Sequence, residues 1–448
     1  MMTQPSVSKN GFLLTNALVI PGAHAEPLSS GAIMIRSGQI EAIGPSENLV
    51  GQYPQLSQVD MQGYLIAPGM INAHTHSSMG FFRSLGHAAA HSTAEDMSTM
   101  IERFFYPAEK ALSAELIEPL AYSYLVDTLR SGVTCVGDAY FYASGVAKAC
   151  DRLGMRGFIG EHIADLGGAV DAGLDYWQKT KSWLETWNYS SRVMPMVYAH
   201  ATDTVSLPLL QKLGEYARYH QLPFHMHLSQ SDGEYDRVQK RCQINPVAYA
   251  KQAGVLGPQS LLVHLVSAKE DELAVLRDSG STAVICPVSE MIYERLPDLA
   301  TIETLGIPVC LGTDSPASND GADLLAELRI YGLLLKDRGL DSRYYHANRL
   351  LQAVTSQAAK SYGLPNLGEL RPGYLADLVC YQLDLGCLPA TRPLETLIYS
   401  MGSRQVSHVM IDGEWVLWNR ELARVNEREL TAEYLSAVSE IKKRSSLP

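Results

Sequence analysis

The chain has few cysteines and no recognisable targeting segment. Its seven cysteines are an odd number, and no two of them form a C-x-x-C pair. Such a set is typical of reduced thiols, so we expect a cytoplasmic protein without a disulfide framework. The N-terminal residues lack the order of a charged stretch followed by an apolar one that marks a signal peptide.

Basic charge and long apolar runs are also scarce. The formal net charge of the 448 residues is -12 and the pI is near 5.6, without a cluster of lysine and arginine. This balance argues against a nucleic-acid-binding surface. No apolar run approaches the ~20 residues that cross a bilayer, so no membrane partner is expected. At 46% apolar residues, the chain can bury either one large core or a core with a satellite domain.

Against this background, the most informative feature is the pair His74-x-His76. It ends the apolar run that begins at Leu65. Side chains two residues apart on a strand point to the same face, so both imidazoles can reach one ion from the tip of one strand.

Three later segments repeat this pattern of an apolar strand that ends in a polar ligand. They end in His227, His264 and Asp314. Three imidazoles and a carboxylate suit a borderline-soft divalent ion such as zinc and leave a fourth imidazole for chemistry. The sequence therefore predicts one metal site.

Apolar strand candidates alternate with amphipathic helical stretches along the middle of the chain. The strands are expected to end near His76, Asp138, Glu161, His200, His227, His264, Pro287 and Asp314. Eight such units predict a parallel (β/α)8 barrel over residues 64–365. In that fold the chemistry lies at the carboxyl ends of the strands, where these histidines and aspartates fall.

The two flanks are typical of short β-strands and turns. Residues 1–63 and 366–425 are expected to join into one small β-sandwich beside the barrel, and the turn Asp412-Gly413 predicts a hairpin within it. Residues 426–448 are expected to form a polar helical tail.

Seven runs of the sequence resemble the amidohydrolase superfamily, in particular its aminohydrolases and chlorohydrolases that act on purines, pterins and s-triazines. The runs are Pro68–His76, Leu129–Thr134, His225–His227, Val263–His264, Cys286–Ser289, Leu311–Asn319 and Gly368–Val379. They follow one another in order over nearly the whole chain. The resemblance implies a small heterocyclic substrate, and because similar proteins are often dimers, a homodimer is expected.

The resemblance also implies roles for single residues. The implied metal ligands are His74, His76, His227 and Asp314. Asp314 would also accept a proton from the activated water, while His264 would hydrogen-bond that water or the developing oxyanion. His200 would contact the substrate. Members with two metals carry a carboxylated lysine at the end of the fourth strand, and the run Met194–His200 contains none, so one metal is expected.

Two departures from the family pattern bear on the chemistry. Gln230 stands where the aminohydrolases carry a glutamate that moves protons, and an amide cannot do so at neutral pH. Glu290 stands where the family has asparagine. Drift at two tolerant positions is one interpretation. The other is that Glu290, with Glu234 behind it, takes over acid catalysis, or that Glu290 binds a cationic substrate group.

The sequence favours hydrolytic deamination of an electron-poor heterocycle. Aromatic side chains after the metal pair, Phe82 among them, could hold a planar ring. The alternatives are dechlorination or amide cleavage by the same activated water, and a catalytically weak protein that binds a ligand. Release of ammonia, release of chloride and binding without turnover distinguish these three hypotheses.

Overall fold

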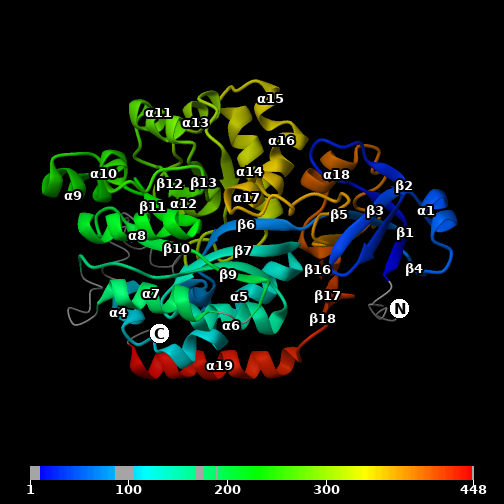
Figure 1. The fold of residues 1–448 in the computed structure, drawn as a ribbon, viewed down its shortest axis with the longest axis horizontal. Coiled ribbons are helices and arrows are strands. Elements are labelled where there is room, and N and C mark those ends of the chain that lie inside the picture. Colours follow the sequence, from blue (N-terminus) through cyan, green and yellow to red (C-terminus); the bar gives the residue numbers. More distant parts are fainter. Residues whose placement is uncertain (1–10, 86–104, 168–174, 188–189, 446–448) are drawn as a thin grey trace.

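The computed structural model describes residues 11–85, 105–167, 175–187 and 190–445, and it is a mixed α/β structure. Nine parallel strands occupy its centre, with helices around them (Figure 1). They are β6 (Met70–Thr75), β7 (Val133–Tyr140), β8 (Arg156–Glu161), β9 (Val193–Pro195), β10 (Val197–Ala201), β11 (Phe224–Leu228), β12 (Ser260–His264), β13 (Thr282–Ile285) and β14 (Val309–Leu311).

The central strands form two parallel sheets, β6-β7-β8-β9 and β10-β11-β12-β13-β14. A parallel bridge between Thr75 and Asp314 connects the end of β6 to the segment after β14. Each of the eight predicted strand positions holds a strand. The fourth is divided into β9 and β10 around Met196, which follows Pro195, a residue without a backbone N–H to donate.

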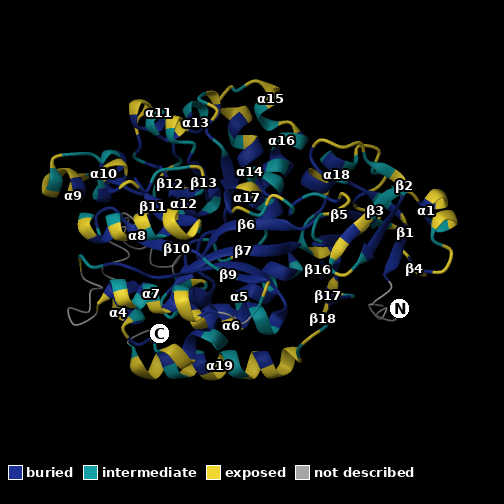
Figure 2. Cartoon of the chain, viewed as in Figure 1, coloured by how far each residue is buried: buried dark blue, intermediate teal, exposed yellow. Residues whose placement is uncertain are grey.

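Helices follow most of the central strands. They are α4 (Tyr106–Glu109), α5 (Ala114–Arg130), α6 (Ala143–Leu153), α7 (Tyr176–Thr186), α8 (Leu207–His220), α9 (Asp232–Cys242), α10 (Pro246–Ala253), α11 (Glu270–Ser279), α12 (Pro287–Tyr293), α13 (Leu299–Thr304), α14 (Leu324–Asp337), α15 (Ser342–Tyr345), α16 (Ala347–Ala353) and α17 (Ser356–Ser361), with a 3-10 turn, η1 (Ser77–Phe82). Buried residues fill the strands, and exposed residues lie on the outer helix faces (Figure 2).

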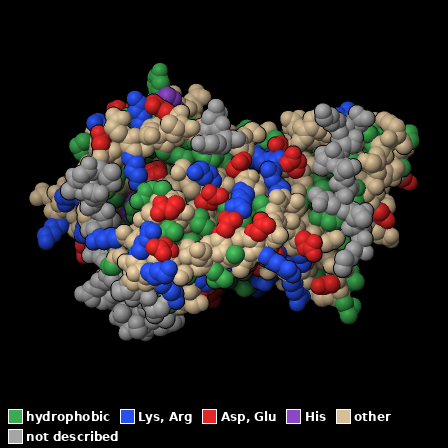
Figure 3. Space-filling model, turned by 90° about the horizontal axis from the view of Figure 1, so that it is seen from below, with side chains coloured by type: hydrophobic (Ala, Val, Ile, Leu, Met, Phe, Trp, Pro, Cys, Tyr) green, Lys and Arg blue, Asp and Glu red, His purple; other side chains and the backbone are tan. Residues whose placement is uncertain are grey.

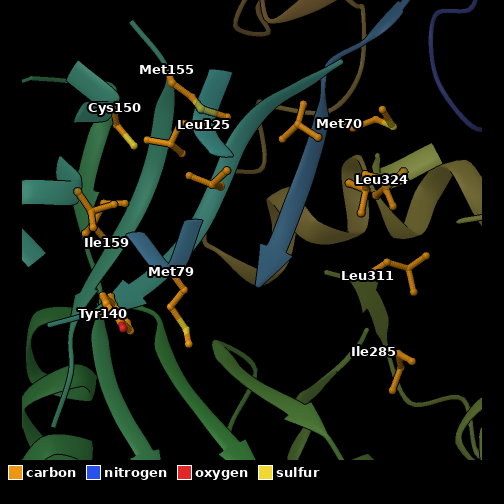
Figure 4. Close-up of a cluster of buried hydrophobic side chains, with 14 of the residues drawn as sticks. Met70, Met79, Leu125, Tyr140, Cys150, Met155, Ile159, Ile285, Leu311 and Leu324 are labelled. Atoms are coloured by element: carbon orange, nitrogen blue, oxygen red, sulfur yellow. The ribbon is translucent and has the colours of Figure 1, made fainter. Parts of the chain in front are cut away.

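Alternation along the strands supplies two separate cores. Outward-facing residues such as Ile159 pack with Leu125 of α5 and Cys150 of α6 (Figure 4). The opposite faces form an inner cluster, in which Phe158 of β8 and Val284 of β13 belong. Both faces of these strands are therefore buried, as is usual for parallel sheets.

Both ends of the chain contribute to a third sheet, the terminal sheet. Its strands are β1 (Phe12–Val19), β2 (Leu28–Arg36), β3 (Gln39–Pro45), β4 (Ser57–Asp60), β5 (Tyr64–Pro68), β15 (Leu378–Gln382), β16 (Val406–Ile411), β17 (Glu414–Trp418) and β18 (Glu421–Leu422). Strand β5 pairs antiparallel with β15, which joins the two halves. The helices α1 (Ser46–Gln52) and α18 (Pro393–Ser400) and the 3-10 turn η3 (Ser403–Gln405) also come from these flanks.

A buried ion pair connects the terminal sheet to the central strands. The Arg156 guanidinium of β8 donates to both carboxylate oxygens of Asp377, at 2.8 and 2.9 Å, and the Asp412 backbone N–H donates to the same carboxylate at 2.8 Å. Both charged side chains are almost fully buried. Direct hydrogen bonds therefore satisfy this buried pair.

The last helix, α19 (Glu427–Arg444), packs along α5 on the lower side of Figure 1. Lysine, arginine, aspartate and glutamate are intermingled on the face seen from below (Figure 3). None of the helices in the described part of the chain is both long enough and apolar enough to cross a membrane.

Candidate metal centre and active site

Four side chains predicted as metal ligands meet at the carboxyl ends of the central strands. His74 and His76 come from the end of β6, His227 from β11, and Asp314 from the segment after β14. The Asp314 backbone N–H donates to the His74 carbonyl at 3.0 Å and holds the two segments together. Asp314 has φ of 56°, in the left-handed region, a conformation that non-glycine residues keep where surrounding contacts enforce it.

The nitrogen and oxygen atoms of this group face one another. His227 Nε2 lies 3.2 Å from His74 Nε2, and Asp314 Oδ1 lies 3.4 Å from His74 Nε2 and 3.6 Å from His76 Nε2. Two ligands that are each ~2.0–2.1 Å from a tetrahedral zinc ion are separated by about 3.3–3.4 Å. The spacing therefore fits a shared ion.

The contacts of Nδ1 in His76 and His227 explain why Nε2 of each ring carries no proton. His76 Nδ1 lies 2.5 Å from the Ala139 carbonyl, and His227 Nδ1 lies 2.9 Å from the His200 carbonyl. A carbonyl only accepts, so each Nδ1 donates and each Nε2 keeps a bare lone pair. Bare lone pairs beside a carboxylate repel one another unless a cation lies between them, so the donor set fits zinc.

The charge states of these groups agree with that arrangement. Burial lowers the pKa of His74 to about 3 and lowers the pKa of His76 below its ordinary value, so both rings are neutral ligands. Burial alone would raise the pKa of Asp314, but the imidazoles that face it, with His74 first among them, hold it well below its ordinary value. Neutral imidazoles and an ionised carboxylate are the forms that bind zinc.

The second carboxylate oxygen of Asp314 is held by two hydroxyls. Ser289 donates to Oδ2 at 2.6 Å and Ser318 donates at 3.1 Å. These bonds leave Oδ1 to face the histidines. Neither serine was predicted as a site residue, although both lie within the runs that resemble the family.

His264 ends β12 and contacts Glu290 on α12. Its Nδ1 lies 3.4 Å from Glu290 Oε1, and its ring stacks on His227 with 5.3 Å between centroids. Burial alone would lower the pKa of His264, but the hydrogen bond to Glu290 and the charges of Asp314 and Glu290 raise it above its ordinary value. His264 is thus suited to carry a positive charge near neutral pH.

Glu290 itself lies behind His264. Its Oε1 also accepts from the Cys286 backbone N–H at 2.9 Å, while Oε2 is buried without a hydrogen-bond partner among the described residues. Burial raises its pKa. Glu290 lines a small cavity of about 230 Å³ with His264, Gln230 and Tyr293 instead of the main pocket. The structure therefore brings Glu290 to His264 rather than to the substrate space.

Gln230 lines the main pocket, and Glu234 holds it there. The Glu234 carboxylate accepts from the Gln230 backbone N–H at 2.7 Å and from the Thr202 hydroxyl. Glu234 is fully buried, and burial raises its pKa to about 7. Its contacts are those of a support for the turn after β11, and it is not among the residues that line the pocket.

The main pocket, of about 570 Å³, opens onto three of the four predicted ligands, His76, His227 and Asp314, and onto His264, while His74 is buried behind them. Its apolar wall consists of Met79, Phe105, Tyr106, Tyr140 and Tyr198. His200 lines it, as predicted for a substrate contact. Phe82 does not, because its ring packs on Phe105 in the core beneath the wall.

A carboxyl group and an imidazole that were not predicted also line this pocket. Glu109 hydrogen-bonds to the Tyr140 hydroxyl at 2.6 Å, and burial raises its pKa to about 7. The Nε2 atom of His162 is buried without a partner among the described residues. The centroid of its ring lies 4.8 Å from that of His200. Position directly after the strand residue Glu161 was the one signal that could have identified His162.

Comparison with known proteins identifies the family of this chain. The model of the family described as the amidohydrolase family matches residues 65–416. The chain belongs to that family. It is 31% identical over 436 residues to a 5-methylthioadenosine/S-adenosylhomocysteine deaminase of Syntrophobacter fumaroxidans, which covers 94% of this chain and 96% of the relative. A deaminase of the same name from Pyrococcus furiosus is 31% identical over 432 residues, covering 95% of this chain and all of the relative.

Solved structures of this fold include zinc enzymes. An adenosine deaminase from Xanthomonas campestris with bound zinc superposes with a TM-score of 0.87 at 25% identity, over 96% of this chain and 98% of that one. The atrazine chlorohydrolase of Arthrobacter aurescens TC1, complexed with zinc, gives a TM-score of 0.83 at 20% identity, over 95% and 100%. At this lower identity the likeness shows the fold.

Proposed function

We propose that this member of the amidohydrolase family is a mononuclear zinc hydrolase that removes the exocyclic amino group of an aminopurine nucleoside. The observation that carries the proposal is the facing set of His74, His76, His227 and Asp314 at the base of a pocket with aromatic walls. The deaminases that share 31% identity over nearly the whole chain support the substrate class. One metal is proposed because β10 supplies no lysine.

The proposal extends to the architecture and the setting. The parallel bridge at Thr75 supports a single (β/α)8 barrel over residues 64–365. A buried cluster that contains Phe12 and Trp415, from opposite ends of the chain, supports a β-sandwich built from 1–63 and 366–425, with 426–448 as the tail. The seven free cysteines support a cytoplasmic location, and a homodimer stays a prediction.

The chemistry follows from the residues around the pocket base. Zinc held by His74, His76, His227 and Asp314 would lower the pKa of a water molecule towards ~7 and so provide a nucleophile at neutral pH. Asp314, with Oδ1 facing the ligand histidines, would accept the proton that this nucleophile loses. His264, kept positive by Glu290, donates a proton to the amino group, so that the carbon–nitrogen bond breaks with ammonia as the leaving group. The proton held by Asp314 then restores His264.

This route assigns the missing acid to His264 and Glu290 together. Gln230 orients the ring nitrogens by hydrogen bonds, because its amide cannot transfer a proton at neutral pH. Under this proposal Glu290 acts through His264 and does not touch the substrate, which replaces the earlier expectation of a direct contact. His200 remains the proposed contact of the substrate wall, with Tyr140 and Tyr198 beside it.

Gln230 also favours a second candidate, hydrolytic dechlorination. Chloride leaves as an anion and needs no proton, so the loss of the family glutamate would matter less. Amide cleavage is a further form of the same reaction, with the same activated water.

The deciding experiment offers zinc-loaded protein 5′-methylthioadenosine, S-adenosylhomocysteine, adenosine, guanine and atrazine, with ammonia and chloride measured separately. An Asp314→Ala variant is the control for metal-dependent turnover. Ammonia from a nucleoside supports deamination, whereas chloride alone supports the second candidate. Binding of these compounds without release of either product contradicts both.

A further inference from the structure

A further buried imidazole, that of His225, lies against His74 behind the proposed metal centre. His225 precedes the proposed ligand His227 by two residues on β11, so both side chains point to the same face of the strand. His225 is completely buried, and its Nε2 lies 2.9 Å from Nδ1 of the ligand His74. The two rings are nearly parallel, with an interplanar angle of 18°.

Tyr362, at the end of α17, reaches the other side of His225. Its hydroxyl lies 3.5 Å from His225 Nδ1 and donates to the Ala73 carbonyl at 2.8 Å. The Tyr362 ring stacks on Phe158, with 4.3 Å between centroids. Opposite it is Gly137, where an added Cβ would lie 1.7 Å from the hydroxyl oxygen. Glycine at that position is required for the hydroxyl to reach Ala73 and His225.

The protons in this chain of groups can be arranged in one way that serves a metal. His74 must keep Nε2 bare to bind the ion, so its Nδ1 carries the proton and donates to His225 Nε2. His225 then carries its own proton on Nδ1, which points to the Tyr362 oxygen. The Tyr362 hydroxyl in turn donates its hydrogen bond to the carbonyl of Ala73, the neighbour of His74. The opposite direction would protonate Nε2 of His74 and block the ligand.

We propose that His225 and Tyr362 are positioning residues of the metal centre, which hold His74 in the tautomer and ring orientation that bind zinc. Partners of this kind are commonly carboxylates or carbonyls, as for His76 and His227 here. For His74 the partner is a neutral imidazole, completed by a phenol from outside the central strands. The inference rests on the zinc centre of the proposed function but not on its substrate.

The test measures zinc affinity by competition with a chromophoric chelator, for His225→Phe, His225→Gln and Tyr362→Phe. Phenylalanine at 225 fills the space without an acceptor for His74. It should weaken zinc binding by about 10–100-fold, the usual effect of losing such a partner. Glutamine can accept from His74 and donate to Tyr362, so it should restore part of the affinity. Tyr362→Phe keeps the stacked ring and should give a smaller loss.

Two further readouts separate positioning from packing. The visible spectrum of cobalt-substituted protein should shift in His225→Phe, because the geometry around the ion changes. The melting temperature of the metal-free protein should change less than that of the zinc-loaded protein. Tyr331→Phe on α14 is the matched control, since it removes another buried phenol, which donates to Glu303 of α13 at 2.7 Å.

Wild-type zinc affinity and an unshifted cobalt spectrum in both His225→Phe and Tyr362→Phe would overturn the inference. So would a loss of affinity that glutamine does not relieve and that an equal fall in metal-free stability explains. A wild-type protein that takes up no zinc would instead contradict the proposed function, and with it the positioning role of His225 and Tyr362.

Discussion

The charge of the His264 ring depends on its contact with the carboxyl group of Glu290. Glu290 Oε1 is the contact that raises the pKa of a ring that burial alone would make neutral. An asparagine in this position could accept the same hydrogen bond but would add no charge. The difference between glutamate and asparagine at position 290 is therefore a difference in whether His264 can act as an acid.

Replacing Glu290 with glutamine should lower kcat on the true substrate by roughly the 10²–10⁴ that a lost general acid costs, with KM little changed. Because protonated His264 is the proposed acid, activity should decline as the pH rises through its pKa. Removing the carboxylate lowers that pKa, so the alkaline limb of the kcat–pH profile should move to lower pH. A rise in KM with unchanged kcat would point instead to substrate binding, and unchanged kinetics would point to drift.

At the scale of single residues, the sequence predicted best where chemistry and strand position coincide. The four proposed ligands and His264 stand at strand ends, so periodicity alone placed them at one edge. Glu109, His162 and the serines around Asp314 came together through contacts between distant segments, which no local pattern encodes. Glu290 was expected at the cleft, but the first turn of α12 turns its side chain back onto His264.

The turn between β11 and α9 shows how an element positions the site. Ser231 caps the helix by accepting from the Glu234 backbone N–H at 3.1 Å, and the Glu234 carboxylate returns to the Gln230 backbone N–H. These bonds fix the turn between the proposed ligand His227 and the helix. Strands and helices of this kind were predictable from periodicity, whereas the break of the fourth strand at Met196 was not, because it depends on pairing with β8.

Glu234 also makes a prediction about stability and pH. Its pKa is raised from 4.5 to about 7 in the folded state, so the folded chain keeps a proton that the unfolded chain releases. The contribution of Glu234 to the free energy of unfolding therefore falls as the pH rises from about 4.5 to 7. The free energy of unfolding of Glu234→Gln, relative to wild type, should increase over that range in urea titrations. The exposed Glu185→Gln is the control, and a difference independent of pH would contradict the assignment.

For the whole molecule, metal content and stability should change together. Purified protein, freed of loosely held metal, should carry close to one zinc or similar ion per chain. A ligand that binds only the folded state at 100 times its Kd stabilises it by ~2.7 kcal/mol, so chelation should lower Tm. His227→Ala should lose both the metal and this effect, whereas His408→Ala, a buried histidine of the terminal sheet, should keep the metal. Two tightly bound ions, or full occupancy in His227→Ala, would contradict the site.

The ion pair between Arg156 and Asp377 should carry much of the attachment between the terminal sheet and the central strands. Asp377→Ala leaves a buried guanidinium unpaired, which costs about 3–5 kcal/mol. Urea unfolding of the zinc-loaded protein should show this loss, while Glu41→Ala, which breaks the exposed pair with Arg36, should change stability by ~1 kcal/mol or less. Equal effects of the two changes would assign the buried pair no special role.

The pairing of β5 with β15 has a consequence for folding during synthesis. About 310 residues separate Pro68 from Leu378, and at roughly 5–20 residues per second a ribosome needs about 15–60 s to bridge them. Throughout that interval β5 has an unpaired edge, and the apolar faces of β1 and β2 lack the side chains of β16 and β17. An open strand edge is a template for aggregation. Residues 12–68 are therefore the part of a nascent polypeptide that a chaperone would be expected to shield until the last strands emerge.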